Sequence, residues 1–173
     1  YAIDPFSLFF KYFILATSAV IVLFALQSAE LREQPGLGEF FAFIAATTFG
    51  MVLMSGATNL LMIYLSLELV SIPSYVLAGF SKTRARSGEA ALKYVLFGGA
   101  SSGVMLYGMS LLYGLTGSLE LSAIHGSLAM GDVAHSVGNY TVLILATIMI
   151  LAGFGYKISA VPFHFWTPDV YEG

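Results

Sequence analysis

Residues 59–80 read NLLMIYLSLELVSIPSYVLAGF, an almost unbroken apolar stretch whose one charged side chain is Glu68. A helix needs about 20 predominantly apolar residues to cross the hydrocarbon core of a membrane, and this stretch is long enough. Pro73 has no N–H to offer the carbonyl of Leu69, so we expect a kink close to the carboxylate. The stretch therefore predicts a transmembrane helix with an acidic group near its middle.

Four further apolar stretches of similar length lie at about residues 5–26, 38–55, 88–115 and 139–166. The chain is 58% hydrophobic and only 10% charged, a composition far from that of water-soluble domains. We predict an all-α fold, a polytopic transmembrane bundle of about five helices that forms a single segment over residues 1–173. The last stretch contains Pro162, and we expect its helix to be broken there.

The composition also excludes several kinds of site. The chain has no cysteine, which excludes thiolate metal sites and iron–sulfur ligation by this chain. A net charge of −3, spread over loops and helix interiors, gives no sign of nucleic-acid binding. His125 and His135 lie in a predicted loop without other metal ligands, so we expect neither a metal nor a cofactor in this chain. The expected surroundings are the lipid bilayer and other membrane proteins.

The distribution of basic residues predicts the orientation. Lys82, Arg84 and Arg86 lie close together after residue 80 and make up three of the seven basic residues. Because Lys and Arg concentrate in cytoplasmic loops, we expect this loop on the cytoplasmic side. Residues 117–138 contain no Lys or Arg and include Asp132, so we expect them on the opposite side.

Four ionisable residues fall within the predicted spans: Glu68, Lys93, Lys157 and His164. A charge at the bilayer centre costs about 2.5–3.5 kcal/mol on insertion scales, so such groups face a partner or a hydrated cavity. Glu68 is too deep to reach either surface. It could be half of a static ion pair between helices or a group that takes part in proton transfer, and both interpretations require a basic partner.

Lys157 and His164 lie on either side of Pro162, which cannot donate a hydrogen bond to the carbonyl of Ile158. Broken helices recur in transport pathways, and irregular backbone at membrane depth is tolerated where it is buried in protein or lines water. If the break is mild, the lysine and the histidine share a helix face, and the lysine could exchange protons. The alternatives are a lysine permanently paired with Glu68 and a histidine that only packs.

Lys93 follows Glu89 by four residues, the order that favours an ion pair along a helix. Lys93 is also close to the predicted cytoplasmic end of its helix. Its ammonium could therefore extend to the membrane surface instead of acting inside the membrane.

Three motifs occur in order: ELVSIPSYVL at residues 68–77, EAALKY at 89–94 and GYKISAVPFHFWTPDVY at 155–171. Together they resemble the antiporter-like membrane subunits of respiratory complex I, NADH:quinone oxidoreductase. Within that family, residues 69–75 are most similar to the N-type subunits. The resemblance implies a fold built from inverted helix repeats. Because the chain lacks an initial methionine and stops just after the last motif, we expect a fragment that holds most of the first repeat.

The resemblance further implies roles for the four ionisable residues. In the family, the glutamate that matches Glu68 pairs with the lysine that matches Lys157 on a broken helix. Lysines that match Lys93 and Lys157, with the histidine that matches His164, belong to a proton path along the membrane midplane. The resemblance thus implies a proton-translocating subunit driven by redox chemistry elsewhere in the complex.

The implied partners are the other membrane-arm subunits of complex I. NADH, FMN, the iron–sulfur clusters and quinone are expected in partner subunits and not in this chain. The implied location is the bacterial inner membrane, with the mitochondrial inner membrane and the thylakoid as further possibilities. Two rival functions stay open: a stand-alone cation/proton antiporter, and a structural membrane module whose charges form static ion pairs.

Overall fold

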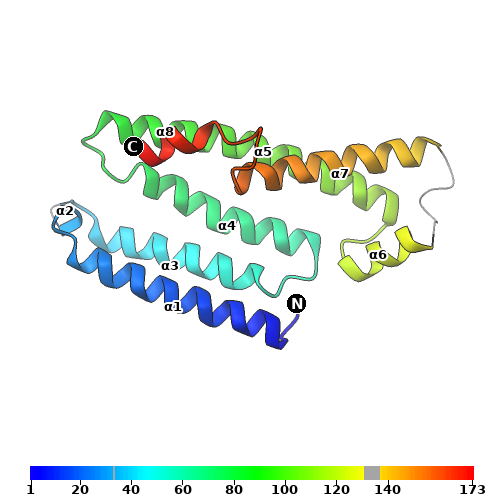
Figure 1. Cartoon of the computed structure of the whole chain (residues 1–173), viewed down its shortest axis with the longest axis horizontal. Coiled ribbons are helices and arrows are strands. Elements are labelled where there is room, and N and C mark those ends of the chain that lie inside the picture. The colour runs from blue at the N-terminus through cyan, green and yellow to red at the C-terminus, as the bar shows by residue number, and fades with distance from the viewer. Residues whose placement is uncertain (33, 131–136) are drawn as a thin grey trace.

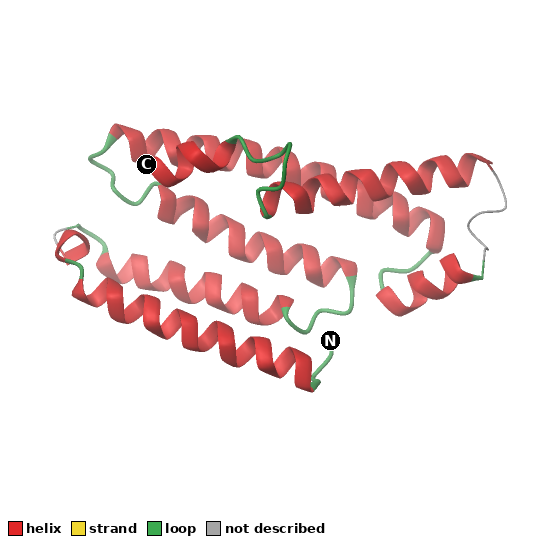
Figure 2. Cartoon of the chain, viewed as in Figure 1, coloured by secondary structure: helices red, strands yellow, loops and turns green. Residues whose placement is uncertain are grey.

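A computed structural model of the chain describes residues 1–32, 34–130 and 137–173. Asp132 and His135, which belong to the predicted outer segment, lie outside the described residues. The described part is helical and contains no strand (Figure 2). Its helices are α1 (Pro5–Gln27), α2 (Ala29–Arg32), α3 (Leu37–Met54), α4 (Leu60–Ala78), α5 (Ala85–Thr116), α6 (Leu121–Ala129), α7 (Val137–Lys157) and α8 (Trp166–Glu172).

Five of these helices, α1, α3, α4, α5 and α7, are long and apolar enough to cross a membrane. This confirms the predicted all-α bundle of five spanning helices. The structure differs from the expectation in two places. The short helix α6 forms within the predicted outer loop, and the fifth span ends at Lys157, five residues before Pro162.

The spanning helices lie side by side in chain order (Figure 1). Helix α1 packs on α3, α3 on α4, and α4 on α5. Helices α7 and α8 both pack on α5, α7 along its C-terminal part and α8 along its N-terminal part, where the chain ends. Helix α5 therefore lies between α4 on one side and α7 and α8 on the other. The break between α7 and α8 lies beside the middle of α5.

Local signals in the sequence explain where the first helices begin. Asp4 caps α1 by accepting a 2.7 Å hydrogen bond from the Ser7 N–H, and Ser7 Oγ accepts a bond from the Asp4 N–H in return. Pro5 stands in the first turn, where an N–H is not needed. Asn59 caps α4 by accepting a 2.9 Å bond from the Leu61 N–H.

Helices α5 and α7 approach each other closely at two glycines. A Cβ added to Gly108 would lie 2.8 Å from the carbonyl oxygen of Ala146, and one added to Gly153 would overlap the Cβ of Met105. The Met105 side chain is fully buried. Small residues thus allow the two backbones to come together, as is usual between helices in membranes.

A run of small residues, GGASSG, occupies positions 98–103 of α5. Gly98 faces the hydroxyl of Tyr75, and Ser102 is buried. Gly99 and Gly103 have no described atom within 4 Å of an added Cβ. Among the described residues, contacts are therefore made by only one face of the run.

Helix α4 continues through Pro73. Pro73 leaves the Leu69 carbonyl without its usual helical donor, and Gly50 of α3 lies against this point. A Cβ added to Gly50 would lie 3.1 Å from the Leu69 carbonyl carbon and 3.0 Å from the Val70 nitrogen. The backbone of α3 therefore covers the interrupted part of α4.

The loops fall into two groups at opposite ends of the bundle (Figure 1). The chain start, the α3–α4 turn and α6 share one end; Ala2 N–H donates to the Gly56 carbonyl at 2.8 Å, and Asn59 Nδ2 donates to Glu120 Oε1 at 3.0 Å. The basic loop around Lys82 lies at the other end. This grouping agrees with the predicted topology, while the membrane side that each end faces stays a prediction.

Candidate functional site

The structure brings Glu68 and Lys157 together. Glu68 lies in the middle of α4, and Lys157 is the last residue of α7. Glu68 Oε1 and Lys157 Nζ are 4.0 Å apart, and 21% of the Glu68 side chain and 12% of the Lys157 side chain are exposed. The two residues therefore form a long ion pair, and both side chains are largely buried.

Each charge of this pair has a closer partner of its own. Ser102 Oγ of α5 donates a 2.5 Å hydrogen bond to Glu68 Oε1. Lys157 Nζ donates to Ser71 Oγ of α4 at 2.5 Å. The Ser71 hydroxyl in turn donates to the Leu67 carbonyl at 2.6 Å. Both charges are therefore solvated by hydroxyl groups, which reduces the penalty of burying them.

A tyrosine completes the surroundings of Lys157. Lys157 Nζ lies 3.3 Å from the hydroxyl of Tyr75 and 5.7 Å from the centre of its ring. Both contacts favour the charged ammonium, through an N–H···O bond and a cation–π contact. A tyrosine hydroxyl can also donate, whereas the single proton of Ser71 is directed to the Leu67 carbonyl.

Four aromatic residues fill the space beside this site. The rings of Tyr75 and Tyr94 meet edge to face at 4.7 Å, Tyr94 stacks on Trp166 at 4.7 Å, and Trp166 lies 5.1 Å from Tyr156. Trp166 Nε1 donates a 3.2 Å hydrogen bond to the Tyr156 carbonyl. This aromatic cluster (Tyr75, Tyr94, Tyr156, Trp166) fixes the start of α8 against α5 and α7.

The end of α7 is closed by its own backbone. Ser159 has a left-handed conformation (φ 55°). Its N–H donates to the Tyr156 carbonyl, and the Ala160 N–H donates to the Gly155 carbonyl at 2.8 Å. These two bonds form a Schellman motif, which satisfies carbonyls at a helix end. The break next to Lys157 is therefore capped, which makes an interrupted helix tolerable at membrane depth.

His164 lies apart from the pair. It is exposed on the loop between α7 and α8, with its ring 5.5 Å from that of Phe165. The break is not mild, so His164 does not share a helix face with Lys157 as we expected for a mild break. No hydrogen bond or ion pair among the described residues links its side chain to Glu68 or Lys157. The physical reason is that the cap at Ser159 turns the chain before Pro162 is reached.

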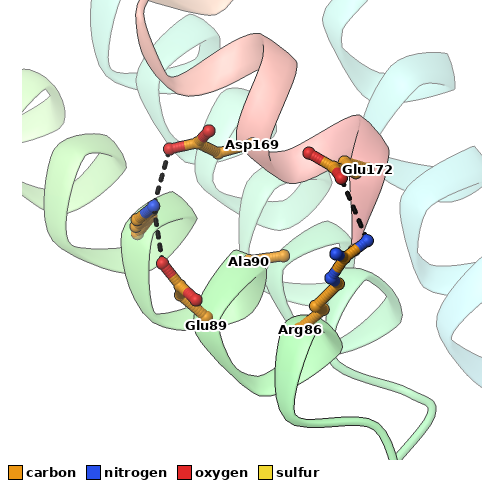
Figure 3. Close-up of a pocket in the computed structure, with 7 residues that line it drawn as sticks. Arg86, Glu89, Ala90, Asp169 and Glu172 are labelled. Atoms are coloured by element: carbon orange, nitrogen blue, oxygen red, sulfur yellow. Dashed lines mark hydrogen bonds and ion pairs between the residues drawn. The ribbon is translucent and has the colours of Figure 1, made fainter.

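Lys93 forms a second charged site, near the N-terminal end of α5 (Figure 3). Its Nζ lies 2.7 Å from Glu89 Oε1, which confirms the expected ion pair along the helix. The same Nζ lies 2.7 Å from Asp169 Oδ2 of α8. Arg86 and Glu172 pair at 3.0 Å beside it. These residues line a polar pocket of about 170 Å³.

Sequence reasoning missed several of these partners. Ser71 follows Glu68 by three residues, so helical spacing could have placed it on the same face. Ser102 and Asp169 are separated from their partners by 34 and 76 residues, and no local pattern indicates such contacts. No group of three or more potential metal ligands occurs in the described part of the chain.

The profile of a family described as NADH:quinone oxidoreductase/Mrp antiporter, TM, matches residues 57–173, which is more than half of the chain. The chain belongs to this family. Its matched region begins just before α4 and contains Glu68, Lys93, Lys157 and His164. The family membership confirms the resemblance found in the three sequence motifs.

Individual relatives agree. The chain is 49% identical over 175 residues to NADH-quinone oxidoreductase subunit N 2 of Chloroherpeton thalassium, covering 100% of this chain and 33% of that protein. It is 47% identical over 171 residues to NAD(P)H-quinone oxidoreductase subunit 2 of Nostoc punctiforme, covering 98% of this chain and 31% of that protein. The chain thus spans about a third of the length of the curated relatives it matches.

Solved structures show the same fold. A chain of respiratory complex I from Thermus thermophilus with bound aureothin matches with a TM-score of 0.75 and 33% identity, over 100% of this chain and 36% of that one. A chain of the archaeal membrane-bound sulfane sulfur reductase matches with a TM-score of 0.77 over 94% of this chain and 32% of its own length. At 24% identity, the second likeness shows the fold alone.

Proposed function

We propose that this chain is part of a proton-translocating membrane subunit of NADH:quinone oxidoreductase, in which Lys157 carries a proton. The observation that supports this most directly is the Glu68–Lys157 pair at the capped break between α7 and α8. Titratable groups inside membranes mark ion and proton paths by default. The names of the relatives from Chloroherpeton thalassium and Nostoc punctiforme support the choice of enzyme.

The mechanism is electrostatic. With its proton, Lys157 is attracted to Glu68 across 4.0 Å and donates to Ser71 and Tyr75. Without it, the attraction to Glu68 disappears, and the neutral amine can accept a hydrogen bond from the Tyr75 hydroxyl. Glu68 keeps its bond from Ser102 in both states. The pair can thus strengthen and weaken without leaving either group unsolvated.

Lys93 and His164 take outer positions in this proposal. Lys93 exchanges protons at the polar end of α5, where its side chain is 35% exposed. His164 stands on the exposed loop after the break and would pass protons to parts of the subunit beyond this chain. Tyr94 follows Lys93, Tyr156 precedes Lys157, and Trp166 contacts both rings. No hydrogen bond among the described residues joins the two lysines, so proton transfer between them would require water.

The redox chemistry would lie in partner subunits that bind NADH, FMN, iron–sulfur clusters and quinone, while this chain moves protons only. We place the subunit in the inner membrane of a bacterium, since the relatives named above are bacterial, beside other membrane-arm subunits and lipid. The family description also covers Mrp antiporters. A stand-alone antiporter is therefore the second candidate, and it would exchange cations for protons without NADH.

Substitution of Lys157 in the full-length subunit tests the proposal. Lys157→Met and Lys157→Arg should both assemble into the complex and lose NADH-driven proton pumping, measured by dye quenching in inverted membrane vesicles. Arginine should fail because it keeps its proton at any accessible pH. If arginine pumps as well as lysine, only a fixed positive charge is needed, and the carrier role is wrong. Cation/proton exchange by the full-length subunit alone, without NADH, would favour the antiporter.

A further inference from the structure

Helix α8 is held on α5 by two neighbouring ion pairs (Figure 3). Lys93 of α5 meets Asp169 of α8 at 2.7 Å, and about two turns nearer the start of α5, Arg86 meets Glu172 at 3.0 Å. The pairs differ in one respect. Lys93 also contacts Glu89 of its own helix at 2.7 Å, so its ammonium lies between a carboxylate of α5 and a carboxylate of α8.

Helix α8 also contacts the neighbours of both lysines. Its first residue, Trp166, is 6% exposed and stacks on Tyr94, the residue after Lys93. The same indole donates a hydrogen bond to the carbonyl of Tyr156, the residue before Lys157. Asp169 follows Trp166 by three residues, about one helical turn. The position of α8 therefore determines where the Asp169 carboxylate lies relative to Lys93. The position of α8 depends in turn on the segment that begins at Lys157.

We propose that Asp169 is a positioning residue of the proton path. Its bond to the Lys93 ammonium makes the geometry at Lys93 depend on the helix that follows the break at Lys157. This inference rests on the proposed function and extends it, because it names a link between Lys93 and the helix break that follows Lys157.

The alternative is that Asp169 only helps to attach α8 by charge. The structure offers a control for this alternative, since the Arg86–Glu172 pair attaches the same helix to the same face of α5 without touching Lys93. Loss of either pair should affect stability little, because the four side chains are between 35% and 78% exposed. Without Asp169, Lys93 still has Glu89 as its counter-charge, so no unpaired charge is left in the membrane.

The test compares Asp169→Asn with Glu172→Gln in the full-length subunit, within the assembled complex. Both variants should assemble to near the wild-type amount. Proton pumping per assembled complex should fall at least about fivefold in Asp169→Asn, which corresponds to a rise of about 1 kcal/mol in the barrier. It should stay within about twofold of wild type in Glu172→Gln, as expected for an exposed ion pair. Equal losses in the two variants, or none in Asp169→Asn, would overturn the proposal.

Asp169→Glu provides the second measurement, because it keeps the charge and lengthens the side chain by one methylene. It should assemble and pump more than Asp169→Asn, and it is the deciding variant if the asparagine substitution lowers assembly. Pumping no better than in Asp169→Asn would contradict the proposal. Lys157→Met in the same vesicles separates the two claims. If Lys157→Met pumps, the proposed function fails; if it does not and Asp169→Asn does, only the role of Asp169 fails.

Discussion

Replacing both members of the Glu68–Lys157 pair should do less harm than the two single changes predict. The two charges are 4.0 Å apart, and at that distance their attraction is about 1 kcal/mol in water and about 4 kcal/mol at an effective dielectric constant of about 20. With 21% and 12% of the side chains exposed, we expect a coupling energy between these limits. Removing one partner alone leaves a buried charge without its counter-charge, although Ser102 or Ser71 still solvates it.

The assay is a double-mutant cycle with Glu68→Gln and Lys157→Met, measuring the free energy of unfolding of the full-length subunit in detergent. The Arg86–Glu172 pair serves as the control cycle. Its atoms are closer, at 3.0 Å, but its side chains are 78% and 68% exposed, so its coupling should stay below about 1 kcal/mol. Coupling at Glu68–Lys157 within about 0.5 kcal/mol of zero, the range of independent sites, would refute the reasoning.

Three further outcomes are expected. Gly153→Ala should lower the free energy of unfolding by about 1–3 kcal/mol, because the new methyl group would overlap Met105. The control Gly114→Ala should leave it unchanged, because no described atom lies within 4 Å of the new methyl group. Equal effects of the two changes in thermal unfolding would argue against tight α5–α7 packing. Ser159→Val should cost about 1–3 kcal/mol, because a branched residue resists a positive φ, while Ser159→Gly should be nearly neutral; a neutral valine would show that the helix end does not need this conformation. Cysteines at Lys82 and Ser122 should be labelled from opposite faces of the membrane by an impermeant thiol reagent, and labelling of both from one face would overturn the topology.

The sequence predicts the five spans well because each is a long and predominantly apolar stretch, and length and composition decide whether such a stretch can cross a membrane. It also predicts the Glu89–Lys93 ion pair, since a spacing of four residues fixes the neighbours on a helix. Contacts along one element are therefore readable from the chain. They depend on helical geometry and not on how the helices pack.

The details of the break were harder to predict. Pro162 indicated an interruption, but α7 ends at Lys157 because Ser159 adopts the left-handed conformation of a Schellman cap. That position is usually a glycine, so a serine there does not indicate a helix end in the sequence. Its hydroxyl accepts a 2.8 Å bond from Thr167 of α8, a contact that exists only in the folded chain. The partners Ser102 and Asp169 escaped prediction for the same reason, since both depend on helix packing.

Helix α3 contributes to the site although it supplies none of its charges. Gly50 lies against the Leu69 carbonyl that Pro73 leaves without a donor, one residue from Glu68. A carbonyl without a hydrogen-bond donor is costly when it faces lipid, because the hydrocarbon layer contains no water to donate to it. Because Gly50 of α3 lies against the Leu69 carbonyl carbon and the Val70 nitrogen, the interrupted part of α4 faces protein on this side. The absence of a side chain at Gly50 thus allows this contact, and any larger residue there would push α3 and α4 apart.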